Sequence, residues 1–235
     1  MKKIKIILYV TGILFAANLT LSCNKEDSSN QSNFETGTLT DIDGNVYKSI
    51  KIGDQWWMAE NLRVSKFRNG DEISYTATNS EWRTLTIPSY CYYNNGFEAY
   101  AQVYGFLYNW KAASDSRNIA PEGWHVPTEA EWRTMVDYLG GSAMAGGKMK
   151  EAGTKHWFSP NTGATNSSGF SALPSGSRGA STGEFGWLGT GNDYWSISAN
   201  SYIYAWAFYV GNNITDCLQL SHNKNNGFAI RCVKD

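Results

Sequence analysis

The sequence of 235 residues is short of charge. Only 17% of its residues are Asp, Glu, Lys or Arg, whereas typical globular domains have about 25%. The 20 basic residues do not outnumber the 21 acidic ones, and the formal net charge is -1. Because nucleic-acid binding depends on a surplus of Lys and Arg that meets the phosphates, the composition gives no reason to expect DNA or RNA as a partner.

Complete catalytic and metal-binding motifs are also lacking. The sequence contains no H-E-x-x-H, P-loop or full G-x-G-x-x-G, and three scattered histidines without a C-x-x-C give no zinc template. Residues 41–45 begin like a calcium loop, but no Glu follows at the twelfth position, so a turn held by Asx hydrogen bonds is favoured. We expect no catalytic residue and no cofactor or metal, and calcium stays open without a motif to support it.

Residues 179–183 match the G-x-S-x-G pattern of a nucleophile elbow. That elbow needs a buried strand before the serine and a helix after it. The residues on both sides of this match are typical of turns instead. A flexible Ser/Gly turn therefore explains the pattern better than a hydrolase site.

The longest apolar run lies at the N-terminus and is short. Basic residues precede the apolar stretch 6–17, which is too short for the roughly 20 residues of a membrane helix and suits a secretory signal. We predict a signal peptide over residues 1–22. Residues 19–23 resemble the lipobox of bacterial lipoproteins, which makes Cys23 the predicted lipidated residue. A membrane anchor, or an ordinary signal followed by a structural cysteine, is the alternative.

A polar segment follows Cys23 and is predicted to be a flexible tether over residues 23–36. Its acidic pair, Glu26 and Asp27, resembles the signal that sends some bacterial lipoproteins to the outer face of the outer membrane. We therefore predict a surface-exposed outer-membrane lipoprotein that contacts the membrane only through its lipid. Attachment facing the periplasm is the alternative.

With Cys23 acylated, an odd number of cysteines remains: Cys91, Cys217 and Cys232. Cys217 and Cys232 are 15 residues apart in two expected strands joined by a polar connection, so they could face each other across a hairpin and form a disulfide. Pairing of Cys91 with either one stays open. Cys91 lies in an aromatic run, where a buried thiol is favoured.

Periodicity predicts several elements along the chain. The pattern Thr128-x-x-Glu131 is a capping box, and apolar residues at helical spacing follow it up to the glycines at 140–141, so a helix over 128–139 is predicted. Looser helical patterns cover 104–113 and 144–152. The expected strands are 38–40, 46–52, 202–210 and 228–233.

These elements predict an α+β fold. Strands lie at both ends and helices in the middle, so the two ends are expected to pair in one small twisted antiparallel sheet. Two main helices, at about 104–113 and 128–139, flank it. Residues of about 153–195 carry Gly, Ser, Thr and Asn without periodicity and are predicted to form a long loop region, a kind of segment that is often functional.

Six motif blocks in register resemble the Fibrobacter succinogenes major paralogous domain family. They are residues 55–62, 104–110, 123–132, 169–178, 194–196 and 227–235. The resemblance covers one domain, residues 37–235, and implies a C-type-lectin-like fold similar to that of formylglycine-generating enzymes. It implies little about activity, because fold does not carry function.

Aromatic residues are the remaining functional feature. Trp57, Trp110, Trp132 and Trp206 occupy motif or periodic positions and are expected in the core. The candidate ligand-binding residues lie in the long loop region, where exposed rings could stack on a sugar and polar groups could hydrogen-bond its hydroxyls. They are Arg178, Trp187, Asn192, Asp193, Tyr194 and Trp195.

Together these observations predict a non-catalytic surface lipoprotein that binds a glycan or protein ligand through its long loop region. Resemblance to formylglycine-generating enzymes leaves an alternative, an oxidase acting through Cys217 and Cys232. A structural or assembly subunit of a cell-surface complex is a further alternative, and it would expose a large apolar patch.

Overall fold

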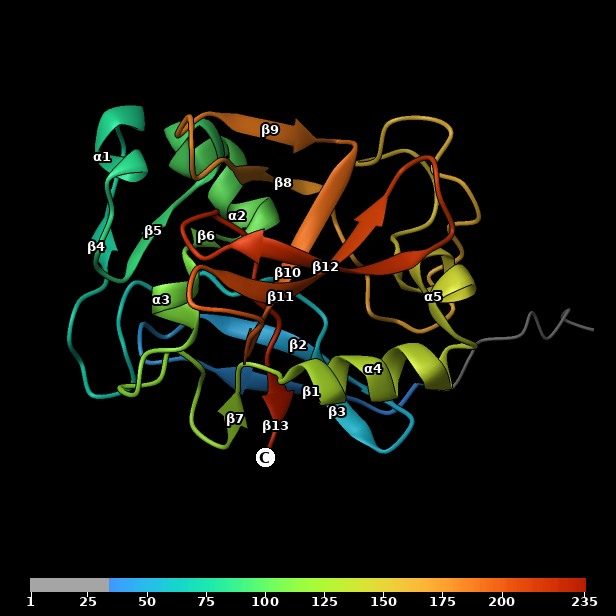
Figure 1. Cartoon of the computed structure of the whole chain (residues 1–235). Coiled ribbons are helices and arrows are strands. Elements are labelled where there is room, and N and C mark those ends of the chain that lie inside the picture. The colour runs from blue at the N-terminus through green and yellow to red at the C-terminus, as the bar shows by residue number, and fades with distance from the viewer. Residues whose placement is uncertain (1–33) are drawn as a thin grey trace, which may run out of the picture. The chain divides into compact units, whose positions relative to one another are not determined.

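The computed structural model describes residues 34–235. The predicted signal peptide, Cys23 and the tether as far as residue 33 lie outside the described residues. The described chain is an α+β fold dominated by short strands, most of them paired antiparallel (Figure 1). Among residues 34–235, no helix has the length and apolarity needed to cross a membrane.

The first sheet joins the two ends of the domain. Its strands, in spatial order, are β1 (Thr36–Thr40), β2 (Val46–Ile52), β3 (Gln55–Met58), β13 (Val233–Lys234) and β7 (Trp124–His125). All pairs are antiparallel, and Val233 lies opposite Trp57 on one side and His125 on the other. The prediction that the two ends pair in one antiparallel sheet is confirmed.

The predicted strands 38–40 and 46–52 and the turn between them are also confirmed, and they form an antiparallel hairpin. Its turn is held by Asp41, whose Oδ1 accepts hydrogen bonds from the backbone N–H groups of Asp43 at 3.0 Å and Asn45 at 2.9 Å. These are the Asx hydrogen bonds expected of a plain turn. Oδ2 of the same carboxylate accepts the hydroxyl of buried Tyr47, which ties the turn to the core.

The second sheet lies above the first in Figure 1. Its strands, in spatial order, are β12 (Cys217–Asn223), β11 (Tyr204–Gly211), β10 (Gly191–Ala199), β8 (Ser175–Arg178) and β9 (Phe185–Leu188). Only β10 and β8 run parallel. A third, small sheet contains β4 (Ser74–Tyr75), β5 (Ser89–Cys91) and β6 (Leu107–Tyr108).

The longest helix is α4 (Glu129–Tyr138), and it confirms the predicted helix over 128–139. Thr128 and Glu131 form the capping box, with the Thr128 backbone N–H donating to Glu131 at 2.7 Å. The buried side of α4 carries Trp132, Met135 and Val136. The following helix, α5 (Ser142–Met149), corresponds to the pattern predicted over 144–152. It begins two residues earlier than predicted and ends three residues earlier.

The predicted helix over 104–113 is wrong. The chain forms α2 (Gln102–Tyr104), then β6, then α3 (Trp110–Ala113). Gly105 ends α2 at a φ of 74°, and a Cβ there would lie 2.7 Å from the Cβ of Asn61. The close approach of two backbone segments therefore breaks the helical pattern, and the Asn109 side chain starts α3 by accepting from the N–H of Ala112 at 3.0 Å.

The predicted loop region over 153–195 is only partly correct. It contains β8, β9 and the first half of β10, so the irregular part is confined to the residues before Ser175. Small residues carry β8 because the backbones approach closely there. A Cβ on Gly176, for example, would lie 2.5 Å from the carbonyl oxygen of Gly186, so glycine here marks strand packing and not a loop.

Aromatic side chains fill the core. Trp132 lies between sheets, with ring centroids 4.8 Å from Trp57, 5.0 Å from Phe208 and 5.5 Å from Tyr194. Trp57 and Trp132 are fully buried, as predicted. Trp110 and Trp206 are only partly buried.

His125 links the final residue to the start of α4. Its Nδ1 lies 2.6 Å from the Asp235 carboxylate and its Nε2 lies 2.7 Å from Glu131. Partial burial opposes the charged ring, but the hydrogen bonds and charges of Asp235 and Glu131 prevail and raise the pKa of His125 above its ordinary value.

A raised pKa in the folded state makes this link pH-dependent. Its contribution to stability is fully present below the pKa of an unfolded histidine, about 6.5, and is lost as the pH rises through the higher pKa of the folded protein. We expect the free energy of unfolding, measured in urea at several pH values, to fall over that range. In His125→Gln the same fall should be reduced; an identical pH profile for both proteins would show that the link is not responsible.

Candidate functional site

Five of the six predicted ligand-binding residues are buried, so the prediction that they form a surface site is wrong. Their exposed fractions lie between 0% and 7%. They are Arg178, Asn192, Asp193, Tyr194 and Trp195. Trp187, the sixth, is 65% exposed.

The burial follows from the position of β10 inside the second sheet. Four of the five buried residues belong to this strand, which has β11 on one side and β8 on the other. The indole N–H of Trp195 donates to the carbonyl of Tyr108 at 2.8 Å, and Ser175 donates its hydroxyl to the Asn192 side chain at 2.5 Å. Burial therefore keeps these residues from a ligand at the surface, and Asn192 Oδ1 and the Trp195 indole N–H are used in internal hydrogen bonds.

Trp187 and a second exposed ring, Phe158, form what we call the aromatic platform. Phe158 is 61% exposed. Its backbone N–H donates to the carbonyl of Gly189 at 2.7 Å, and its ring lies over Gly189, where a Cβ would be 2.8 Å from the ring. Because Gly189 follows Trp187 by two residues, the two exposed rings stand on neighbouring backbone.

The backbone under the platform is fixed. The carbonyl of Trp187 accepts from both the N–H and the hydroxyl of Thr190, at 2.9 and 3.0 Å. On the other side, the Asn212 side-chain amide donates to the carbonyls of Phe158 and Ser159, at 3.2 and 3.3 Å. The backbone that carries the two rings is therefore held by hydrogen bonds and has polar groups beside it, as a preorganised binding surface requires.

Trp187 is also held in an unfavourable backbone conformation. Its φ is 67°, a left-handed value that costs a bulky residue on the order of 1–3 kcal/mol and that is found mainly at functional sites. The strained residue carries a large apolar ring that is mostly exposed to solvent, so burial of the ring does not offset the strain. A binding role would account for both the strain and the exposure.

Sequence reasoning missed Phe158. It follows Trp157, which is 1% exposed and donates its indole N–H to the carbonyl of Ala172 at 3.0 Å. Neither residue lies in a periodic segment, so no pattern in the sequence separates the buried ring from the exposed one.

The proposed bridge between Cys217 and Cys232 is absent. Cys217, Cys232 and Cys91 are all free thiols. The predicted hairpin between the two segments does not exist, because Cys217 starts β12 opposite Val210 of β11, whereas the carbonyl of Cys232 accepts from the N–H of Met58 at 2.9 Å. The two thiols belong to different hydrophobic clusters.

Burial makes these thiols unreactive. It raises the pKa of Cys91 and of Cys217 to about 12, and raises that of Cys232 as well. Because the thiolate is the nucleophile, we expect no labelling of the three thiols by iodoacetamide in the native protein at pH 8. All three should be labelled after unfolding without a reductant, as counted by mass spectrometry. Fewer than three labels would reveal a disulfide.

Two other kinds of site that the sequence raised, a metal centre and a nucleophile elbow, are not formed within residues 34–235. Residues 34–235 contain no group of three or more His, Cys, Asp or Glu side chains placed to hold a metal. The G-x-S-x-G segment forms a turn between β8 and β9, closed by the N–H of Gly183 donating to the carbonyl of Gly179 at 2.9 Å. No helix follows it, so the nucleophile-elbow interpretation fails on context.

Fold and site together define a strand-rich α+β domain with an exposed aromatic platform. The chain belongs to the Fibrobacter succinogenes major domain family, whose family model matches residues 50–234. Neither the comparison with curated proteins nor the comparison with solved structures gave a match.

Proposed function

We propose that this domain binds a glycan, without catalysis, through the aromatic platform. The observation that carries the proposal is Trp187, which is 65% exposed at a φ of 67°, on backbone that neighbours that of the exposed Phe158. Flat apolar ring faces pack against the C–H faces of sugars, and neighbouring polar groups give orientation. At the platform, the hydroxyl of Thr190 and the side-chain amide of Asn212 hydrogen-bond to the backbone that carries the two rings.

The proposal extends to the fold and its attachment. We propose a C-type-lectin-like arrangement, supported by the sheet that joins both ends and by the placement of the platform on the second sheet and the irregular segment before it. We also propose that Cys23 is lipidated and that the domain is displayed on the outer membrane. Labelling of cells with a fatty-acid analogue should mark the protein and be lost in Cys23→Ala; persistent labelling would contradict the anchor.

The enzyme alternative has less support. An oxidase of the formylglycine-generating kind would need a reactive cysteine pair, and Cys217 and Cys232 are free, buried and in separate clusters. No other observation on the described residues favours catalysis over binding.

A glycan array followed by titration tests the proposal. We expect the wild-type protein to bind a glycan, and Trp187→Ala and Phe158→Ala to weaken the affinity at least about tenfold, since a buried aromatic contact at an interface contributes about 1–2 kcal/mol or more. Tyr202→Ala is the matched control, because Tyr202 is 96% exposed and lies at the distant β10–β11 turn. A folded wild-type protein that binds no glycan would contradict the proposal.

Trp187→Asn separates binding from folding. Asn tolerates a positive φ far better than Trp, so this variant should keep or raise the free energy of unfolding by up to about 1 kcal/mol while losing glycan binding. A loss of both would mean that Trp187 is a structural residue.

A further inference from the structure

A hollow that shares no residue with the aromatic platform lies on the third sheet. It has a volume of about 440 Å³. One wall is formed by β4 and β5 and the other by the short hairpin that precedes β4. The lining residues are Ser65, Glu72, Ile73, Ser74, Tyr75 and Tyr90.

Two tyrosine rings form the aromatic wall of this hollow. Tyr75 and Tyr90 are direct neighbours in the parallel pair β4–β5, with ring centroids 5.6 Å apart and planes tilted by 53°. Each is stacked on another ring: Tyr75 on Tyr92 at 4.8 Å, and Tyr90 on Phe106 at 4.9 Å. The two rings are thus held in place by their stacking partners, and both line the hollow.

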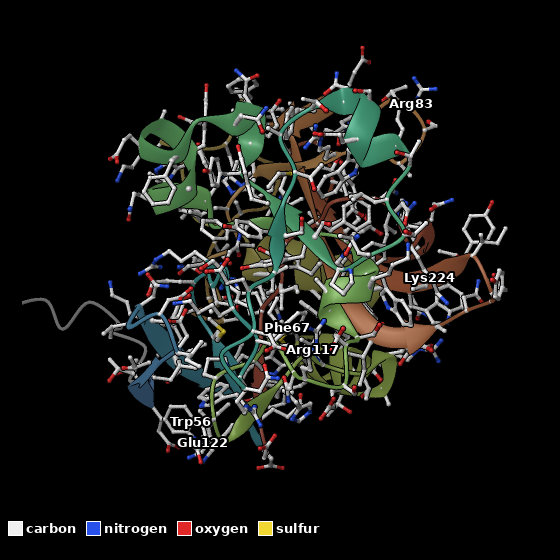
Figure 2. The ribbon with its side chains drawn as sticks, turned by 90° about the vertical axis from the view of Figure 1, so that its left-hand side faces the viewer. Trp56, Phe67, Arg83, Arg117, Glu122 and Lys224 are labelled. Atoms are coloured by element: carbon white, nitrogen blue, oxygen red, sulfur yellow. The ribbon has the colours of Figure 1, made fainter. Side chains whose placement is uncertain are left out.

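The opposite wall is equally well fixed. The N–H of Ile73 donates to the carbonyl of Ser65 at 2.8 Å, which closes the short hairpin. The guanidinium of Arg117 lies over the Phe67 ring at 4.0 Å and pairs with Asp71 at 3.0 Å, and Figure 2 shows Phe67 and Arg117 side by side. The hollow is therefore present before any ligand arrives.

The electrostatics of the hollow favour a positive charge. Glu72 is the only charged side chain in its lining, is exposed, and forms no ion pair within residues 34–235. The nearest lysine, Lys66, pairs with Asp43 at 3.3 Å. Burial, followed by the charges of Tyr92, Asp43 and Glu72, raises the pKa of Tyr90 to about 12, so its hydroxyl stays protonated at neutral pH.

We propose that this hollow binds an organic ammonium group, with the cation over the faces of Tyr75 and Tyr90 and its charge balanced by Glu72. Aromatic faces attract cations through the ring quadrupole, and substituted ammonium ions are recognised in this way.

Titration of the purified full chain with choline chloride, followed by NMR, tests the inference. The neutral isostere 3,3-dimethyl-1-butanol, which has carbon in place of nitrogen, is the matched ligand. We expect choline to bind about tenfold more tightly than the isostere, in line with a desolvated cation–π contact. Vesicles of phosphatidylcholine, compared with vesicles of phosphatidylglycerol, show whether a lipid headgroup or only the free ion can enter.

Four variants identify the contacts. Tyr90→Phe keeps a ring face and should keep choline affinity within about twofold, whereas Tyr90→Leu should lose it. Glu72→Gln should weaken choline binding severalfold and leave the isostere unchanged, while Glu98→Gln, an exposed carboxylate outside the hollow, should change neither. Equal binding of choline and the isostere, binding of methyl glucoside in place of choline, or an unaffected Glu72→Gln variant would each overturn the inference.

Discussion

Lys150→Met is expected to lower the free energy of unfolding by about 3–5 kcal/mol, because every buried carbonyl that loses its donor costs about 1–3 kcal/mol. The Lys150 side chain is completely buried. Its ammonium donates to the carbonyls of Thr162, Gly211 and Ile214, at 3.0, 2.7 and 2.7 Å. Burial lowers its pKa to about 8, so the ammonium is still the main form at pH 7 and can donate all three hydrogens.

Urea unfolding at pH 7 measures this loss. Methionine has a similar length and no donor, so the three carbonyls remain without a partner while the packing volume is nearly kept. Lys155→Met, at an exposed position of the same segment, is the control and should change stability by less than about 0.5 kcal/mol. Equal stability of the two variants would show that water or rearrangement satisfies the carbonyls.

Arg178→Met is expected to cost about 4 kcal/mol or more, since it removes donors from several buried acceptors at once. The guanidinium donates to the carbonyls of Gly183, Thr76 and Ala77, at 2.8, 2.6 and 2.7 Å. It also lies 4.6 Å from the ring centroids of both Trp82 and Phe185. This one side chain therefore joins β8, β9 and the start of α1 (Asn79–Arg83).

The same variant should weaken glycan binding, because Arg178 pairs with Phe185 at the start of the strand that carries Trp187. Thermal unfolding and array titration measure the two effects separately. Arg83→Met is the control, because Arg83 is exposed at the end of α1 (Figure 2), and it should leave both unchanged. Full stability of Arg178→Met would contradict the role given to this residue.

Three basic side chains are buried as hydrogen-bond donors to backbone carbonyls. Lys150, Arg178 and Arg231 are each at most 1% exposed, and within the described chain none of them forms an ion pair. Arg231, for example, donates to the carbonyls of Phe170 and Ser171, at 2.6 and 3.0 Å. These side chains satisfy carbonyls of irregular backbone that strands and helices leave unpaired.

Local signals in the sequence predicted the elements that depend on local interactions. The Asp41 turn and the Thr128–Glu131 capping box each involve groups within four residues of one another, so both could be recognised from the sequence alone. The pairing of the two ends followed from strand patterns at both ends of the domain. Periodicity likewise placed Trp57 and Trp132 in the core.

Long-range contacts decided the rest. Gly105 breaks the expected helix because Asn61, 44 residues earlier, packs against it, and glycines such as Gly176 carry strands where a loop was expected. Arg178 and Trp195 look like ligand-binding residues by type, but their partners come from distant segments. The exposure of Trp187 and Phe158 depends on the same tertiary packing, so composition could indicate an aromatic site without locating it.

Hydroxyl-radical footprinting tests the central claim most directly, because it reports the exposure of individual side chains with and without a saturating glycan selected on the array. The account predicts that oxidation of Trp187 and Phe158 falls severalfold on binding, while oxidation of Tyr202 stays the same. Unchanged oxidation of Trp187 in the glycan-bound protein would contradict the assignment of the aromatic platform as the binding surface.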